Sequence, residues 1–308
     1  MPDDLALVTA YDIPSSPARV RAPARAPVRV ALVQHRWHPD ADEHRAALAR
    51  GVRLAAAEGA QLVCLQELTL SPYFAVDAAG PATSSIEPEP LTAGPTFGFA
   101  AALAAETGAY LLASLYERAD DHALGFNTAI CVAPDRALVS ATRKTHLPVT
   151  AGYHEDRWFR PGDGAHPVHE IAGARFGFPT CWDQWFPELA RAYALSGAEV
   201  LVYPSAIGSE PDHPAFDTQP LWEQVIRAQG IMNGTFMIVP NRTGTEGSVT
   251  FYGSSFVSDP YGRVLARAPR DRPAVLVVDL DLDQRRDWLE LFPLLETRRP
   301  DTYHSLVD

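Results

Sequence analysis

Residues 173–204 constrain the fold of this chain most strongly, because their sequence is typical of a strand, a sharp turn, a helix and a second strand. Pro187 suits the first turn of the helix, where its missing N–H needs no partner. Gly197 suits the position just past the helix, since glycine accepts a positive φ without strain. Cys181 lies at the corner where the first strand ends. We expect the positive end of the helix dipole to favour its thiolate form.

Cys181 alone does not establish a reactive site, because a free cysteine is most often a small buried apolar residue. The chain has two further cysteines, Cys64 and Cys131, and the three show no regular spacing. Such a set predicts neither a disulfide framework nor a zinc motif, and it favours a reducing cytoplasm. The role of Cys181 therefore depends on the rest of the sequence.

Composition argues against several classes of protein. The 308 residues are 46% hydrophobic and 21% charged, which is typical of a globular protein. The formal net charge of −12 argues against a nucleic-acid partner, which usually requires a basic surface. No apolar run is long enough to span a membrane, and the first residues lack the pattern of a signal peptide. Without a glycine-rich phosphate loop, no nucleotide is expected, and we predict a cytoplasmic protein that needs no cofactor or metal.

The apolar pattern predicts an α/β fold. Residues 1–26 are rich in proline, alanine and arginine, so we expect a flexible or loosely docked lead-in. After them, apolar strands first alternate with helices and later follow one another directly, which favours layers of helices and mixed sheet. Strands are expected at residues 28–33, 61–66, 110–117, 127–132, 137–143, 200–203, 236–239, 255–257, 264–266 and 274–279. Helices are expected at residues 41–58, 96–107, 220–232 and 284–291, with an ordered loop at 146–163 and a polar loop at 241–253.

Three reactive side chains follow predicted strands at comparable positions. Glu67 comes after one strand, Lys144 after another, and Cys181 after a third. In a layered α/β sheet the carboxyl ends of strands share one crevice, so these groups can converge although they are far apart in sequence. Taken singly, Glu67 is as well explained by a turn cap and Lys144 by a surface cation.

Together, the three groups match the needs of C–N bond hydrolysis. A thiol attacks the carbonyl carbon, and a carboxylate takes the thiol proton and returns it to the leaving amine. An ammonium group stabilises the oxyanion that forms. A glutamate whose pKa is raised by burial can act as the base without a histidine.

Longer blocks of sequence carry a family resemblance. The segments LQELTLSPYF, RKTHLP…GYHEDRWFRPGD, CWDQWFPELARAYALSGAEVLVYPSAIGSEP and FYGSSFVSDPYG together resemble the nitrilase superfamily of carbon–nitrogen hydrolases, over about residues 28 to 303. The resemblance implies a four-layer α-β-β-α sandwich over residues 27–293. It also implies a catalytic set of Glu67, Lys144 and Cys181, with Glu155 helping to position the lysine and the substrate.

The resemblance has further implications for the site and for assembly. The backbone N–H of Trp182 is expected to be a second oxyanion donor beside Lys144. The expected substrate-binding residues are Trp182, Tyr73, Phe74, Ser205 and Ala206, and further aromatic residues that are candidate pocket walls are Tyr153, Trp158 and Trp185. The family also implies a homodimer or higher homo-oligomer, in which residues 294–308 form an arm packed on a neighbouring subunit.

The substrate class is indicated by the residues around the nucleophile. The sequence after Cys181 most resembles that of N-carbamoylputrescine amidohydrolases of polyamine synthesis. These enzymes cleave a terminal ureido group to give an amine, ammonia and carbon dioxide. Gln184 and Trp185 stand where amino-acid-type carbamoylases carry arginines that grip a carboxylate. The sequence ELTLSPYF lacks the second glutamate of the putrescine type, which indicates a less cationic or more apolar substrate. Hydrolysis of small aliphatic amides, nitrile hydrolysis and a catalytically silent binding role are the alternatives.

Overall fold

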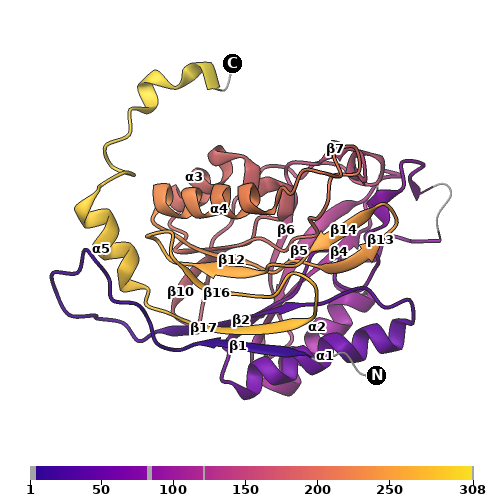
Figure 1. Ribbon diagram of the computed structural model, residues 1–308, viewed down its shortest axis with the longest axis horizontal. Coiled ribbons are helices and arrows are strands. Elements are labelled where there is room, and N and C mark those ends of the chain that lie inside the picture. Colours follow the sequence, from indigo (N-terminus) through magenta and orange to yellow (C-terminus); the bar gives the residue numbers. More distant parts are fainter. Residues whose placement is uncertain (1–4, 82–84, 121, 307–308) are drawn as a thin grey trace.

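The computed structural model describes residues 5–81, 85–120 and 122–306, and two large sheets pack face to face within it (Figure 1). In this described part, the first sheet has seven strands in the order β1-β17-β2-β3-β4-β5-β6, and the second has six in the order β16-β15-β12-β11-β10-β9. The strands of the first sheet are β1 (Ala6–Ala10), β2 (Val28–Gln34), β3 (Leu62–Cys64), β4 (Tyr110–Glu117), β5 (Phe126–Val132), β6 (Leu138–Arg143) and β17 (Ala274–Leu280). Those of the second are β9 (His169–Ile171), β10 (Ala174–Gly177), β11 (Val200–Val202), β12 (Phe236–Val239), β15 (Phe256–Ser258) and β16 (Val264–Arg267).

Helices cover the two outer faces of this pair of sheets. The α-helices are α1 (Ala41–Ala57), α2 (Pro95–Thr107), α3 (Pro187–Leu195), α4 (Gln219–Asn233) and α5 (Asp283–Leu291). Helices α1 and α2 pack on the first sheet, and α3 and α4 pack on the second. Short 3₁₀ helices are η1 (Phe74–Val76), η3 (Glu155–Arg157), η4 (Cys181–Trp185), η5 (Pro300–Thr302) and η6 (His304–Leu306). Pro187 begins α3 and Gly197 follows it with a φ of 97°, as the sequence predicts.

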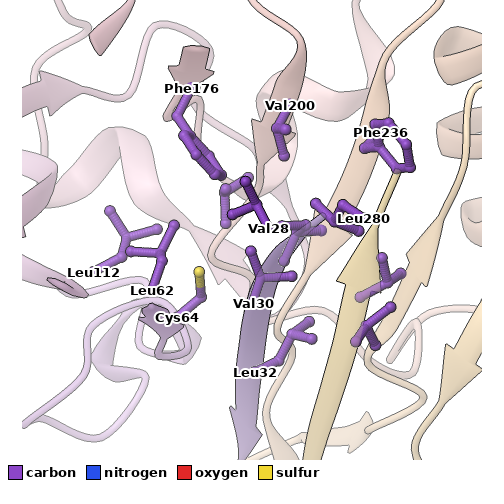
Figure 2. Packing of buried hydrophobic residues seen from close by; sticks show 14 of the residues in the cluster. Val28, Val30, Leu32, Leu62, Cys64, Leu112, Phe176, Val200, Phe236 and Leu280 are labelled. Atoms are coloured by element: carbon purple, nitrogen blue, oxygen red, sulfur yellow. The ribbon is translucent and has the colours of Figure 1, made fainter. Parts of the chain in front are cut away.

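The alternation of side chains along each strand separates the molecule into layers. On β2, Val28, Val30 and Leu32 face the second sheet, where they meet residues such as Phe176 and Phe236. Figure 2 shows these side chains gathered between the two sheets. The intervening residues of the same strands face α1 and α2 instead. Because successive residues of a strand point to opposite faces, one strand contributes to two cores. The fold is therefore the predicted four-layer α-β-β-α sandwich.

The first residues of the described chain differ from the predicted flexible lead-in. Strand β1 pairs in parallel with β17, in the register that puts Ala6 opposite Ala274. Beyond β1, the side chain of Arg19 pairs with Asp281 at 2.7 Å and with Asp287 at 2.8 Å. We name residues 14–25 the N-terminal strap. The two acidic partners of Arg19 lie more than 250 residues away along the chain, so local composition does not reveal them.

Two hairpins lie within segments that the sequence predicts as loops. Strands β13 (Thr243–Glu246) and β14 (Val249–Tyr252) pair in the predicted polar loop, and β7 (Val149–Thr150) pairs with β8 (Tyr153–His154) in the predicted ordered loop. All four strands are short, with two to four residues each, which hides the two-residue period of a strand. No helix in the described residues is both long and apolar enough to cross a membrane.

We expect the N-terminal strap to contribute measurably to stability. Replacement of Arg19 by Gln removes two charge-assisted hydrogen bonds to carboxylates that are largely buried. The free energy of unfolding should fall by about 1–2 kcal/mol, measured from the urea midpoint. The matched control is Arg53→Gln, which breaks an exposed ion pair with Glu106 and should cost about 0.5 kcal/mol or less. Equal effects of the two substitutions would contradict a stabilising role for the strap.

Candidate active site

A fully buried ammonium group lies between two buried carboxylates. Lys144 directly follows β6, and its Nζ lies 2.8 Å from Oε1 of Glu67, three residues past β3. The same Nζ donates to both carboxylate oxygens of Glu155, each at 2.8 Å. Glu155 begins η3, in the segment after Lys144. The structure thus brings together three of the four predicted catalytic residues by direct contact.

The charges of this cluster depend on one another. Burial alone would lower the pKa of Lys144, but Glu155 and Glu67 outweigh it and raise that pKa, so the ammonium stays charged. Burial raises the pKa of Glu155 to about 7, although the ammonium of Lys144 acts in the opposite direction. A single cation therefore has two acidic neighbours, and burial favours the protonated form of Glu155.

Two polar side chains fix the carboxylates in place. Asn127, on β5, donates from its side-chain amide to Oε1 of Glu67 at 2.7 Å. Tyr73 donates its hydroxyl to Oε1 of Glu155 at 2.7 Å. The other oxygen of Glu67, Oε2, is buried and accepts no hydrogen bond from the described residues. Oxygen Oε2 is thus the part of the cluster that is available to accept a proton.

Cys181 begins η4 in a strained backbone conformation, with a φ of 41°. Its N–H donates to the carbonyl of Pro204 at 2.9 Å, and the N–H of Thr180 donates to the carboxylate of Asp183 at 3.1 Å. A left-handed conformation at a residue other than glycine costs about 1–2 kcal/mol and is commonly found at functional sites. These bonds hold the thiol at a sharp corner between strand β10 and the helices that follow.

The environment of the thiol corrects one sequence-based expectation. Burial and the charge of Glu67 raise the pKa of Cys181, and the ammonium of Lys144 and the N–H of Ala206 only partly oppose them. The α-helix whose dipole was expected to favour thiolate is α3, which begins six residues later at Pro187. The thiol is therefore protonated at rest, and a nearby base is needed to activate it.

Cys181 opens into a small cavity of about 80 Å³. The cavity is lined by Tyr73, Pro148, Thr150, Tyr153, Cys181, Trp182, Ala206, Ile207 and Glu210. Three predicted substrate-binding residues, Tyr73, Trp182 and Ala206, are among them, as is the candidate wall Tyr153. Glu210 is the acidic member, and burial raises its pKa. The cavity thus holds a thiol at one place and a carboxyl group at another, between aromatic walls.

Two predicted substrate-binding residues lie elsewhere. Phe74 packs in an aromatic cluster with Trp158, at 4.5 Å between ring centroids, and does not line this cavity. Ser205 is fully buried and donates its hydroxyl to the carbonyl of Tyr203 at 2.9 Å. Tyr73 and Ala206 line the cavity, whereas their sequence neighbours Phe74 and Ser205 are absent from the lining. Trp185 packs beside Trp182 at 6.1 Å and is likewise absent from the lining.

Sequence reasoning missed several residues of the site. Asn127 lies within an apolar strand, and a polar residue in such a run is a usable signal for a buried polar contact. Glu210 lies in the segment SAIGSEP, but nothing in the sequence around it indicates that its side chain lines the cavity. Within residues 5–81, 85–120 and 122–306, no group of three or more His, Cys, Asp or Glu side chains is placed to hold a metal ion.

A four-layer α-β-β-α sandwich with a thiol, two glutamates and a lysine at one crevice defines an amidase-type hydrolase of the nitrilase superfamily. The family model described as carbon-nitrogen hydrolase matches residues 29–290, and the chain belongs to this family. It is 35% identical to N-carbamoylputrescine amidase of Arabidopsis thaliana, over 92% of this chain and 96% of that protein. It is 32% identical to citrullinase of Francisella tularensis, over 91% and 98% of the two chains. A crystal structure of a carbon-nitrogen hydrolase from Helicobacter pylori G27 superimposes with a TM-score of 0.82, at 31% identity over 92% and 99% of the two chains.

The raised pKa of Glu155 predicts a pH-dependent stability. Because the folded protein holds this proton more tightly than the unfolded chain, protonated Glu155 contributes to stability. The contribution is complete below the ordinary pKa of a glutamate, and it is lost as the pH rises through about 7, the pKa in the folded state. Between pH 5 and pH 8 the free energy of unfolding, measured by urea titration, should fall by about 2–3 kcal/mol more in the unmodified protein than in the Glu155→Gln variant. The control Glu170→Gln, at an exposed position on β9, should keep the slope of the unmodified protein. Parallel curves for Glu155→Gln and the unmodified protein would show that Glu155 does not titrate in this range.

Proposed function

We propose that this protein is a cysteine-dependent amidohydrolase that removes the terminal carbamoyl group of an amine such as N-carbamoylputrescine. The observation that carries the proposal is that Cys181, which opens into the small cavity, interacts electrostatically with Glu67 and Lys144 of the buried cluster. Relatives at 35% and 32% identity include N-carbamoylputrescine amidase and citrullinase, and both names describe substrates with a terminal ureido group, whereas deaminated glutathione amidases are 31–33% identical. Glu155 supports the same reading because it accepts from Lys144, and Tyr73 in turn donates its hydroxyl to Glu155.

The first half-reaction forms a covalent bond to sulfur. Glu67 accepts the thiol proton of Cys181 through its free Oε2, and the sulfur attacks the ureido carbon. The ammonium of Lys144 stabilises the negative oxygen of the tetrahedral species, and the backbone N–H of Trp182 is the proposed second donor. Protonated Glu67 then gives its proton to the leaving nitrogen, and ammonia departs. The product is a thiocarbamate, a thioester-type intermediate on Cys181.

The second half-reaction uses water and the same groups. Glu67 takes a proton from water, whose oxygen attacks the thiocarbamate carbon, and Cys181 leaves as the thiol after receiving the proton back. The released carbamic acid decomposes to the amine and carbon dioxide. Because the pKa of Lys144 is raised, this side chain keeps its positive charge through both steps. One carboxylate and one cation therefore serve both the formation and the breakdown of the intermediate.

The acidic residue in the cavity supports a cationic amine as the remote end of the substrate. Glu210 lines the cavity that contains Cys181, whereas no arginine does. A carboxylate favours an ammonium group, and a carboxylate-bearing substrate would lack a guanidinium partner there. The segment that lacks the second glutamate, Thr69 to Ser71, does not line the cavity, and Leu70 packs against the core beneath α1 and α2. The proposed amine site is thus built from another part of the chain.

A substrate panel tests the reaction and its main alternatives. Ammonia release from N-carbamoylputrescine should fall by about 10³-fold or more in Cys181→Ser, because the weaker nucleophile does not form the intermediate. The matched control, Cys131→Ala, changes a fully buried cysteine of the core and should keep turnover of the folded enzyme. Unchanged turnover in Cys181→Ser would rule out the proposed nucleophile.

The same panel separates the candidate substrates. Citrulline shares the ureido end of N-carbamoylputrescine but adds a carboxylate, so faster turnover of citrulline would contradict the amine assignment. Faster hydrolysis of a small aliphatic amide would identify a general amidase. Release of a carboxylic acid and ammonia from a nitrile would identify a nitrilase, and no turnover with any compound would favour a binding protein.

We expect Glu210→Gln to impair recognition of the ammonium end specifically. The KM for N-carbamoylputrescine should rise about tenfold with little change in kcat, because a charge pair that binds ground state and transition state equally is lost. N-butylurea has the same carbon chain without the ammonium group, and its kinetics should not change. Asp212→Asn, an exposed neighbour that does not line the cavity, is the control. Equal KM increases for both substrates would argue against an ion pair with Glu210.

Self-association and a cytoplasmic location remain predictions for this protein. Residues 294–306 leave the sandwich after α5 and extend away from it (Figure 1). The arm carries Tyr303 and Leu306, two large apolar side chains that are exposed. These exposed apolar side chains on an extended arm support the proposal that residues 294–308 pack on a neighbouring subunit.

A further inference from the structure

The two residues that follow β12 contact both halves of the proposed site. Strand β12 ends at Val239, and after Pro240 the chain reaches Asn241 and Arg242. Both side chains are fully buried. The sequence suggested only a polar loop here, and neither residue touches the cavity. A buried guanidinium and a buried amide outside the reacting cluster require partners, since such groups are costly to bury without them.

Arg242 holds the backbone that carries Glu67. Its Nη2 lies 3.0 Å from each of three carbonyl oxygens, those of Glu67, Leu68 and Ser71. The two hydrogens of this nitrogen are therefore shared among three acceptors, which all belong to one tight turn. The turn follows strand β3 and presents the carboxylate of Glu67 to Lys144.

The turn is strained at the residue next to the base. Leu68 has a φ of 49°, a backbone conformation that residues other than glycine rarely adopt. Both backbone groups of Leu68 are held by hydrogen bonds. Its N–H donates to the hydroxyl of Ser114 at 3.1 Å, and its carbonyl accepts from Arg242. A strained residue persists only where the surroundings fix it on several sides. Arg242 is the charged group among those that fix Leu68.

A second connection leads from Arg242 to the other carboxylate of the cluster. Nη1 of Arg242 pairs with Oε1 of Glu246 at 2.7 Å, and Oε2 of Glu246 accepts from the N–H of Tyr73 at 2.7 Å. The hydroxyl of Tyr73 in turn donates to Glu155. Hydrogen bonds therefore link Arg242 to both carboxylate neighbours of Lys144, one through the backbone of Glu67 and one through Tyr73.

Asn241 performs the corresponding task on the side of the thiol. Its Oδ1 accepts from the N–H of Ile207, and its Nδ2 donates to the carbonyl of the same residue, both at 3.0 Å. Ile207 follows Ala206, whose N–H interacts with the sulfur of Cys181. Adjacent residues thus hold the base on one side and the loop beside the nucleophile on the other.

We propose that Arg242 is a positioning residue for Glu67, and that with Asn241 it sets the geometry between base and thiol. The proposal rests on the proposed function of Glu67 and Cys181. Arg242 acts by fixing the strained turn at Leu68, so that Oε2 of Glu67 faces the sulfur. A lysine at this position would retain the positive charge but lacks the planar guanidinium group with its two separate NH₂ nitrogens. It therefore could not bind the carbonyls of the turn and the carboxylate of Glu246 at the same time.

The test is a double-mutant cycle on the alkylation rate of Cys181 by iodoacetamide, followed by mass spectrometry of the labelled peptide. Alkylation needs a deprotonated thiol but no turnover, so it remains measurable in variants that lack the base. Arg242→Lys should slow alkylation about tenfold in the otherwise unmodified protein and less than twofold in Glu67→Gln. The kcat for the carbamoyl substrate should fall by a similar factor, while KM changes less than twofold. Arg53→Lys, at an exposed bidentate pair with Glu106, should change neither quantity.

The outcomes separate this proposal from the proposed function. If Glu67→Gln alone leaves the alkylation rate unchanged, Glu67 is not the base and the proposed function is wrong. If Glu67→Gln slows alkylation but Arg242→Lys slows it equally in both backgrounds, or not at all, Arg242 is not a positioning residue for Glu67. If Arg242→Lys does not fold, Glu246→Gln replaces it in the same cycle, with the same expectation of non-additivity. Failure of both variants to fold would make the pair a stability element and overturn the proposal.

Discussion

The ammonium of Lys144, buried between Glu67 and Glu155, is the interaction on which the site depends. A buried cation is tolerated only when paired, and here two carboxylates, each at 2.8 Å, hold it charged. The same arrangement constrains the acids, because one cation does not neutralise two ionised neighbours. Burial raises the pKa of Glu155, and the charge of Glu67 acts in the same direction. The burial that makes the cluster costly thus also creates a group that exchanges its proton near neutral pH, close to a thiol that burial keeps protonated.

The sandwich makes this cluster possible by bringing together strand ends that are distant in sequence. Glu67 and Lys144 follow strands of one sheet, whereas Cys181 follows a strand of the other. The apolar layer between the sheets keeps the two strand ends at a fixed separation, since side chains in such a core are closely packed. Short connections then add the detail: a strained turn presents Glu67, and a strained corner presents Cys181. The rigid layers supply position, and the loops supply the direction of each reacting group.

Much of the fold and part of the site follow from the sequence. Strands 110–117 and 236–239 have the predicted limits, and Pro187 and Gly197 bound α3 as their local chemistry requires. These features depend on a few neighbouring residues. What the sequence did not reveal depends on distant ones: β1 needs β17 as a partner, and Arg242 contacts Glu67, which is 175 residues away. Tertiary packing, rather than residue type, likewise places Phe74 and Ser205 outside the cavity. It also sets the direction in which the pKa of Cys181 is shifted.

Strand β1 has a consequence for how the protein behaves among other copies of itself. The family match begins at residue 29, so β1 lies outside the common domain, yet it occupies the edge that β17 would otherwise present. An uncovered edge strand is a template on which foreign chains can add, and apolar β17 would be a long and flat one. With β1 in place the outermost strand is only five residues long, and a proline-containing strap follows it. The N-terminal segment thus covers the edge of β17 and leaves a shorter strand edge open to pairing with other chains.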